Sequence, residues 1–166
     1  MDERSDIDTD RRDPEKIPLP PLFEDAKRLG FAELHRRLEA EGHPKLRHAH
    51  GCVFRYIDDE GSRLTDLAAQ SGLTKQAVGE FVDDLERLEY VERIPDPLDG
   101  RAKLIRLTSR GAEGTRSALR IFDEIEREWA ERFGADRVAI LREVLEEIVA
   151  AESAGAADDR GLVTAR

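Results

Sequence analysis

Residues 63–110 read RLTDLAAQSGLTKQAVGEFVDDLERLEYVERIPDPLDGRAKLIRLTSR, and their patterns carry the strongest structural signal in the sequence. Apolar residues between Leu64 and Ala68 recur at the spacing of one helical face. Gly72 follows where a helix needs a left-handed residue to end, and Thr74 can cap the next helix. The apolar stripe of that next helix consists of Val78, Phe81, Val82, Leu85 and Leu88. Two helices joined by so short a turn predict a helix-turn-helix.

A two-stranded hairpin is predicted directly after this pair of helices. Residues 90–94 and 103–107 alternate apolar and polar side chains, as half-buried strands do. Between them, Pro95 and Pro97 are expected to block strand pairing, and Asp99-Gly100 is expected to make a tight turn. From residue 93 to residue 110 the chain carries five Arg or Lys against two Asp. A basic hairpin beside the second helix indicates a wing that binds phosphate.

The whole segment resembles the winged helix of the MarR-type (multiple-antibiotic-resistance) transcription regulators. The resemblance is carried by LTDLA at 64–68, LTKQAV at 73–78, LERL at 85–88, YV at 90–91, DGR at 99–101 and LTSRG at 107–111. It implies a mainly α fold with a small β-hairpin wing (α+β), in which flanking helices pair two chains as a homodimer. It also implies a DNA-binding regulator, expected to be a repressor, that binds a pseudopalindromic operator on double-stranded DNA.

Helical periodicity extends on both sides of this segment. It predicts helices over 22–41, 45–58 and 109–133, and a last helix from residue 136. These helices carry more apolar residues than a small winged helix can cover, which favours a dimer over a monomer folded back on itself. The expected organisation is a disordered arm at 1–21, N-terminal dimerisation and linker helices at 22–60, the DNA-binding unit at 61–108, C-terminal dimerisation helices at 109–151 and a mobile tail at 152–166.

Composition restricts the class of protein. The chain has 166 residues and a net charge of −10, but residues 61–111 carry eight bases against nine acids and are the least acidic third. No apolar run approaches the roughly 20 residues that span a bilayer, so no membrane partner is expected. The single cysteine, Cys52, cannot form an internal disulfide. A cytoplasmic protein is therefore expected.

The candidate DNA contacts fall in two places. The first turn of the second helix can reach base edges in the major groove, where Gln pairs with adenine and Lys with guanine or phosphate. Arg101, at the wing tip, is expected to enter the minor groove. The resemblance implies that Asp99 holds the Arg101 guanidinium in place. The predicted DNA-binding residues are Thr74, Lys75, Gln76, Gly79, Asp99, Arg101 and Lys103. Arg93 and Arg106 either bind phosphate or pair with Glu92 and other nearby acids.

A small-molecule site is implied only by the resemblance. A small aromatic effector would bind between the dimer helices and the winged helix, with His50, Phe54 and Tyr56 as candidate lining residues. His48 and Cys52 are neighbours on a helix, but His50 points away from them, so no metal site is predicted. No cofactor is expected either. No catalytic motif is present, which argues against an enzyme.

One alternative from another functional class stays open. The fold could serve as a winged-helix protein-interaction module without specific DNA binding, its DNA face neutralised by Glu80, Asp83 and Asp84.

Overall fold

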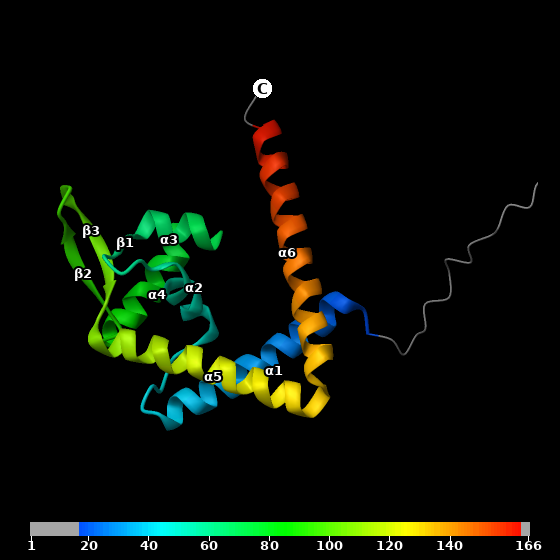
Figure 1. Cartoon of the computed structure of the whole chain (residues 1–166). Coiled ribbons are helices and arrows are strands. Elements are labelled where there is room, and N and C mark those ends of the chain that lie inside the picture. The colour runs from blue at the N-terminus through cyan, green and yellow to red at the C-terminus, as the bar shows by residue number, and fades with distance from the viewer. Residues whose placement is uncertain (1–16, 164–166) are drawn as a thin grey trace, which may run out of the picture.

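A computed structural model describes residues 17–163, and the side chains of residues 17–151. It has the predicted fold class, helices with one small antiparallel sheet (Figure 1). The elements are α1 (Leu19–Ala40), the 3-10 turn η1 (His48–His50), α2 (Gly51–Tyr56), β1 (Ser62–Arg63), α3 (Leu64–Ser71), α4 (Lys75–Arg87), β2 (Val91–Asp96), β3 (Asp99–Leu107), α5 (Ser109–Phe133) and α6 (Ala135–Val163).

The helix-turn-helix is confirmed as α3 and α4. Gly72 ends α3 in the left-handed region at φ 68°, where a residue with a Cβ would be strained. The Thr74 hydroxyl caps α4 by accepting a hydrogen bond from the Ala77 amide at 3.2 Å. The buried side chains beneath these helices form one core with α2 and the sheet: Val53, Leu67, Ala68, Val78, Val82, Leu85, Tyr90, Val91 and Ile105. Each large apolar side chain buried there stabilises the fold by about 1.5–3 kcal/mol.

The sheet has three strands in the order β1-β3-β2, and the sequence did not predict β1. The predicted turn at Asp99-Gly100 is wrong, because Asp96 faces Asp99 and the chain reverses at Pro97-Leu98. The Asp96 carboxylate fixes this turn by accepting the Leu98 amide at 2.8 Å. Pro95 does not block pairing either, since it lies opposite Lys103. β2 is an edge strand, where a missing N–H can face outward.

The segment before the winged helix differs from the prediction. The helix expected over 45–58 is instead η1 followed by the six-residue α2. Lys45 lies at φ 68°, which is incompatible with a helix starting there, and Pro44 restricts the residue before it. α1 in turn begins three residues before the predicted Leu22, because prolines are tolerated in a first helical turn. Residues 1–16 of the expected disordered arm lie outside the described residues.

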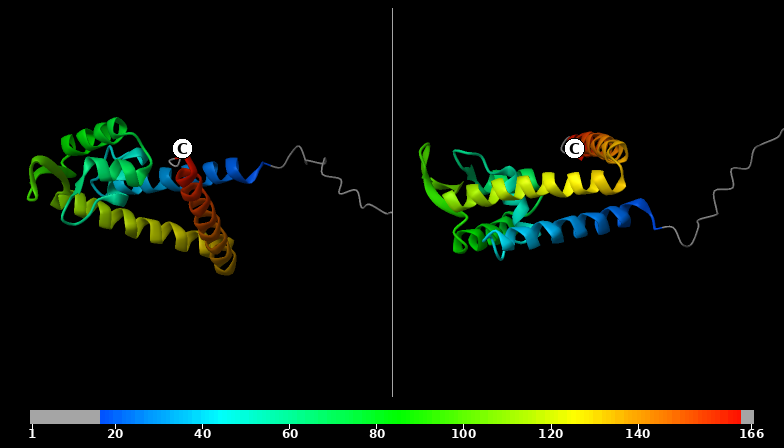
Figure 2. Two further views of the ribbon diagram at one scale, coloured as in Figure 1. Left: turned by 90° about the horizontal axis from the view of Figure 1, so that it is seen from above. Right: turned by 60° about the horizontal axis from the view of Figure 1, so that its bottom comes forward.

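α1 and α5 lie side by side, and α5 connects the winged helix to α6 (Figures 1 and 2). They pack through Leu34 and Leu38 of α1 and Ile121 and Ile125 of α5, all buried. Further along, the Trp129 indole lies 3.4 Å from the position of a Cβ on Gly30. Figure 2 shows α1 and α5 as a two-helix layer extending from the winged helix.

α6 leaves the end of α5 after Gly134 and rises away from the rest of the chain (Figure 1). It continues to Val163, beyond residue 152 where the tail was expected to begin. Up to residue 151, the apolar side chains of α6 are largely open to solvent, with Leu141 47 % and Ile140 59 % exposed. None of the described helices combines the length and apolar composition needed to cross a membrane.

Candidate nucleic-acid interface

The first turn of α4 presents the predicted base-reading side chains to solvent. Thr74, Lys75 and Gln76 are exposed, and Gln76 Nε2 donates to Glu80 Oε1 at 3.4 Å. Gly79 follows on the same helix, and a Cβ added to it would meet only Leu64 Cδ2, at 3.8 Å. No neighbour in the described part of the chain therefore forces this residue to be glycine.

Two acids of α4 bind an arginine of the wing. Arg93 of β2 donates to Asp83 Oδ1 at 2.6 Å and to the Glu86 carboxylate. Of the two roles that the sequence left open for Arg93, the structure shows pairing with nearby acids, because its guanidinium binds carboxylates of α4. Arg106 is engaged as well, donating to Glu92 Oε1 at 2.7 Å on the neighbouring strand. Neither arginine is as free for phosphate as the sequence count suggested.

Asp84, the next residue of α4, is paired with two other arginines. Arg47, before η1, and Arg87, on α4 itself, both contact its carboxylate. Asp83 and Asp84 thus carry bound arginines, so the neutralised DNA face of the alternative hypothesis does not arise from these two residues.

The wing tip exposes Arg101 and Lys103 together. The prediction that Asp99 holds the Arg101 guanidinium is wrong in this structure, because Asp99 Oδ1 accepts the Arg101 backbone amide at 3.1 Å. Asp99 thus orders the backbone of the tip and leaves the Arg101 side chain directed to solvent. An exposed guanidinium on an ordered turn suits contact with a negatively charged groove.

An arginine that sequence analysis missed supports this turn from β1. Arg63 donates to Asp96 Oδ2 through Nε at 2.8 Å and through Nη2 at 2.5 Å, and lies 3.9 Å from Asp99. Asp96 is itself buried, at 5 % exposure. The Leu98 amide, and then the Arg63 guanidinium, hold the pKa of this carboxyl below its ordinary value. Strand β1 is too short to give a periodic signal, which is why the pairing could not be predicted.

Arg110 is one of the five basic residues of 93–110, but its side chain stabilises the packing around Tyr90. Its Nη2 donates to the Gly42 carbonyl at 3.0 Å and to the Tyr90 hydroxyl at 3.3 Å, and its guanidinium lies 4.9 Å from the Tyr90 ring centre. The buried His43 contacts the same hydroxyl through Nδ1 at 3.1 Å. Of the five bases in 93–110, Arg101 and Lys103 are therefore the two exposed at the tip.

The three candidate effector residues have different surroundings. His50 is buried and borders a cleft of about 310 Å³ with Lys45, Arg47, Asp84, Arg87 and Leu88. Phe54 instead packs edge-on against Tyr90, with ring centres 6.1 Å apart, and Tyr56 packs against the winged-helix core. Burial, with the nearby charge of Arg47 and then of His35, lowers the pKa of His50 to about 4. His50 is thus neutral near pH 7.

The single cysteine is half-buried next to this histidine. Cys52 Sγ donates to the Ala49 carbonyl at 3.1 Å, and burial raises the pKa of the thiol. Both features disfavour the thiolate that redox chemistry needs. Among residues 17–151, whose side chains the structure describes, no group of three or more His, Cys, Asp or Glu side chains could hold a metal ion.

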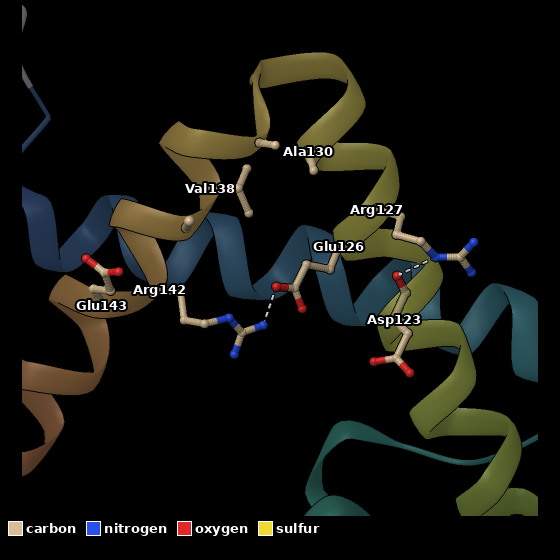
Figure 3. Close-up of a pocket in the computed structure, with 9 residues that line it drawn as sticks. Asp123, Glu126, Arg127, Ala130, Val138, Arg142 and Glu143 are labelled. Carbon is tan, nitrogen blue, oxygen red and sulfur yellow. Dashed lines mark hydrogen bonds and ion pairs between the residues drawn. The ribbon is translucent and has the colours of Figure 1, made fainter.

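A second groove, of about 440 Å³, lies at the elbow between α5 and α6 (Figure 3). Small residues such as Ala130 and Val138 form its floor, and Arg142 of α6 pairs with Glu126 of α5 across it. The groove lies on the flanking helices, away from α4 and the wing.

Part of the chain matches a known protein family. Residues 46–102 match the family model described as "MarR family". This segment is similar to the winged helix of the MarR family. The resemblance predicted from the sequence is thereby confirmed, and the match spans η1 through the wing tip.

Solved MarR-type regulators share the fold well beyond the winged helix. Wild-type MarR from E. coli is 24% identical, with a TM-score of 0.64 over 81% of this chain and 99% of its own. MepR of Staphylococcus aureus, a transcription regulator of the multidrug efflux pump MepA, is 20% identical, with a TM-score of 0.62 over 81% and 98%. The S. aureus MepR-DNA complex is 21% identical, with a TM-score of 0.63 over 82% and 99%. No curated protein sequence matches the chain.

Proposed function

We propose that the protein is a homodimeric transcription regulator, a repressor, that binds a pseudopalindromic operator through α4 and the wing. The observation that carries the proposal is one solvent-facing set of groups on the winged helix. Lys75 and Gln76 stand in the first turn of α4, while Arg101 and Lys103 stand at a wing tip ordered by Asp96 and Asp99. A helix of this kind reads the major groove, and an arginine on a wing suits the minor groove.

The charge distribution agrees with DNA as the partner. The chain as a whole is acidic, but phosphate attraction acts over roughly a Debye length of about 8–10 Å. Within the described chain, the other wing arginines are engaged by protein groups, whereas the tip cations are not. The similar fold of MepR, which was solved as a DNA complex, supports the same partner.

Exposed apolar surface on the flanking helices supports a dimer. Large side chains stay open at the start of α1, along α5 and along α6: Leu19, Leu22, Leu29, Leu119, Trp129, Phe133, Ile140, Leu141, Val144, Ile148 and Val149. So many exposed large apolar side chains on the flanking helices are typical of an interaction surface. A second copy of the chain would cover it and place two copies of α4 about 34 Å apart, one turn of DNA.

The proposal extends to a small aromatic effector that releases the DNA. Its site would lie between the flanking helices and the winged helix, near His50. A DNA-binding regulator of this kind would act in the cytoplasm.

The experiment compares two wing arginines that differ in their contacts. Duplexes are first selected from a random library by the wild-type protein, and the enriched duplex is then titrated with each variant. Arg101→Ala should weaken binding by about 1–3 kcal/mol per half-site. Arg106→Ala, whose side chain is paired with Glu92, should weaken it much less.

Two outcomes would contradict the proposal. If the wild-type protein enriches no duplex, the protein-interaction module becomes the better account. If both variants bind as tightly as the wild type, the wing takes no part in DNA binding.

A further inference from the structure

The four acids of α4 are not equivalent. Asp83 and Glu86 bind Arg93, and Asp84 is contacted by Arg47 and Arg87. Glu80 differs, because among the described side chains its carboxylate accepts only the neutral Gln76 amide, at 3.4 Å. Within the part of the chain whose side chains are described, no Lys or Arg lies at ion-pair distance from Glu80. An exposed carboxylate without a counter-charge therefore stands one turn after the base-reading end of α4.

Glu80 shares a helix face with Gln76. The two residues are four apart, so their side chains are neighbours on the surface, as their hydrogen bond shows. If the first turn of α4 enters the major groove, this face meets base edges, and the inference rests on that part of the proposed function. A carboxylate can only accept hydrogen bonds, so it is repelled by phosphate oxygens and by the O6 and N7 acceptors of guanine.

Among the groups on base edges in the major groove, only an amino group can donate a hydrogen bond to such a carboxylate. The major groove offers N4 of cytosine and N6 of adenine as donors. Adenine is the better partner for an amide, which pairs with N6 and N7 together, whereas a carboxylate suits the cytosine amino group. Gln76 spends one N–H on Glu80 and keeps a second N–H and its carbonyl for such a pair.

We propose that Glu80 is a specificity-determining residue that selects cytosine in each operator half-site. Gln76 reads an adenine close by. Four helical residues rise about 6 Å, which corresponds to roughly two base-pair steps of about 3.4 Å, so the two bases lie within about two steps of each other. The same carboxylate lowers affinity for every sequence that lacks the amino group at that position, because its charge then faces phosphate or guanine without a donor.

The test compares base preference, not overall affinity, in three proteins. Wild type, Glu80→Gln and Glu86→Gln are each used to select duplexes from one random library. Glu86→Gln is the matched control, since it removes the same charge from the same helix at a residue that Arg93 already holds. Circular dichroism checks that all three keep the same helix content.

The wild-type protein should enrich an inverted repeat with one cytosine position per half-site, favoured about tenfold or more over the other bases. Glu80→Gln should lose that preference or move it to adenine, the base that an amide pairs with. Glu86→Gln should keep the cytosine. Both variants should bind unrelated DNA more tightly than the wild type, because each has lost a negative charge.

Two results would overturn the assignment, and they differ in what else they remove. An enriched repeat in which no position responds to Glu80→Gln overturns the role of Glu80 and leaves the proposed function intact. A wild-type protein that enriches no sequence overturns both.

Discussion

At the scale of single residues, Gly111 and Gly79 are under opposite constraints. A Cβ on Gly111 would lie 2.0 Å from the Tyr90 carbonyl oxygen, so α5 could not keep its approach to the wing. Gly79 has room for a Cβ, and glycine within a helix costs about 1 kcal/mol relative to alanine. Stability alone would thus favour alanine at position 79, and a contact from outside the chain can explain the glycine.

We therefore expect opposite effects from the two alanine variants. Gly111→Ala should lower the free energy of unfolding by about 1–3 kcal/mol, as overpacking does. Gly79→Ala should raise it by about 1 kcal/mol and yet weaken operator binding. Urea titrations give the stabilities, and titration of the selected duplex gives the affinity. A Gly79→Ala protein that binds as tightly as the wild type would remove Gly79 from the interface.

His50 should make stability depend on pH. Its pKa in the folded protein, about 4, lies below the ordinary 6.5, so the unfolded chain takes up the proton first as pH falls. Stability from this group is complete above about pH 6.5 and is lost as pH falls toward 4, by at most about 3 kcal/mol. The His50→Gln variant lacks the titrating imidazole and keeps all the other titratable side chains. The free energy of unfolding of the wild type, relative to that of the variant, should fall as pH is lowered from 7 to 4.5. A constant difference would show that His50 is not held neutral.

Among the secondary-structure elements, the wing depends on a short strand, β1, that the sequence does not predict. Arg63 of β1 reaches the buried Asp96, and Asp96 in turn holds the Leu98 amide of the turn. A two-residue strand has no alternation to detect, and the partner of Arg63 is 33 positions away. The helix-turn-helix and α5 were predictable because their caps, Thr74 and Thr108, and their apolar stripes are local signals. The turn position was not, since it depends on where the Asp96 side chain bonds.

Arg63→Gln should therefore loosen the wing tip without removing a DNA contact. Hydrogen exchange at the Leu98 amide should speed up, and affinity for the selected duplex should fall several-fold at unchanged helix content. Arg106→Gln is the control, because its partner Glu92 is half-exposed and such surface pairs contribute about 0–1 kcal/mol. Unchanged exchange and affinity in Arg63→Gln would mean that the turn holds its shape without β1.

At the scale of the whole molecule, the flanking helices carry an unused apolar surface. The apolar residues of α5 are buried only in part, with Ile121 and Ile125 packed against α1 and Trp129 and Phe133 left 39 % and 49 % exposed. The sequence indicated which residues are apolar, but one chain cannot show which of them a second chain covers. The assignment of α1, α5 and α6 as dimerisation helices stays a prediction. It accounts for α6 standing away from its own chain (Figure 1).

Replacing Leu141 and Leu145 of α6 together by aspartate tests that assignment. Both lie on the helix that leaves the body of the protein, and neither is fully buried. The variant should sediment as a monomer and lose operator affinity, although every candidate DNA contact remains. The exposed Glu143 on the same helix offers a control, since Glu143→Asp should leave the dimer unchanged.

Two chains together are expected to bind one inverted repeat, and sedimentation of the wild-type protein with and without its selected duplex measures this stoichiometry. We expect a dimer at micromolar concentration, and two chains on each duplex whose half-sites are centred about 10 base pairs apart. A monomer that occupies the full inverted repeat alone would contradict the account.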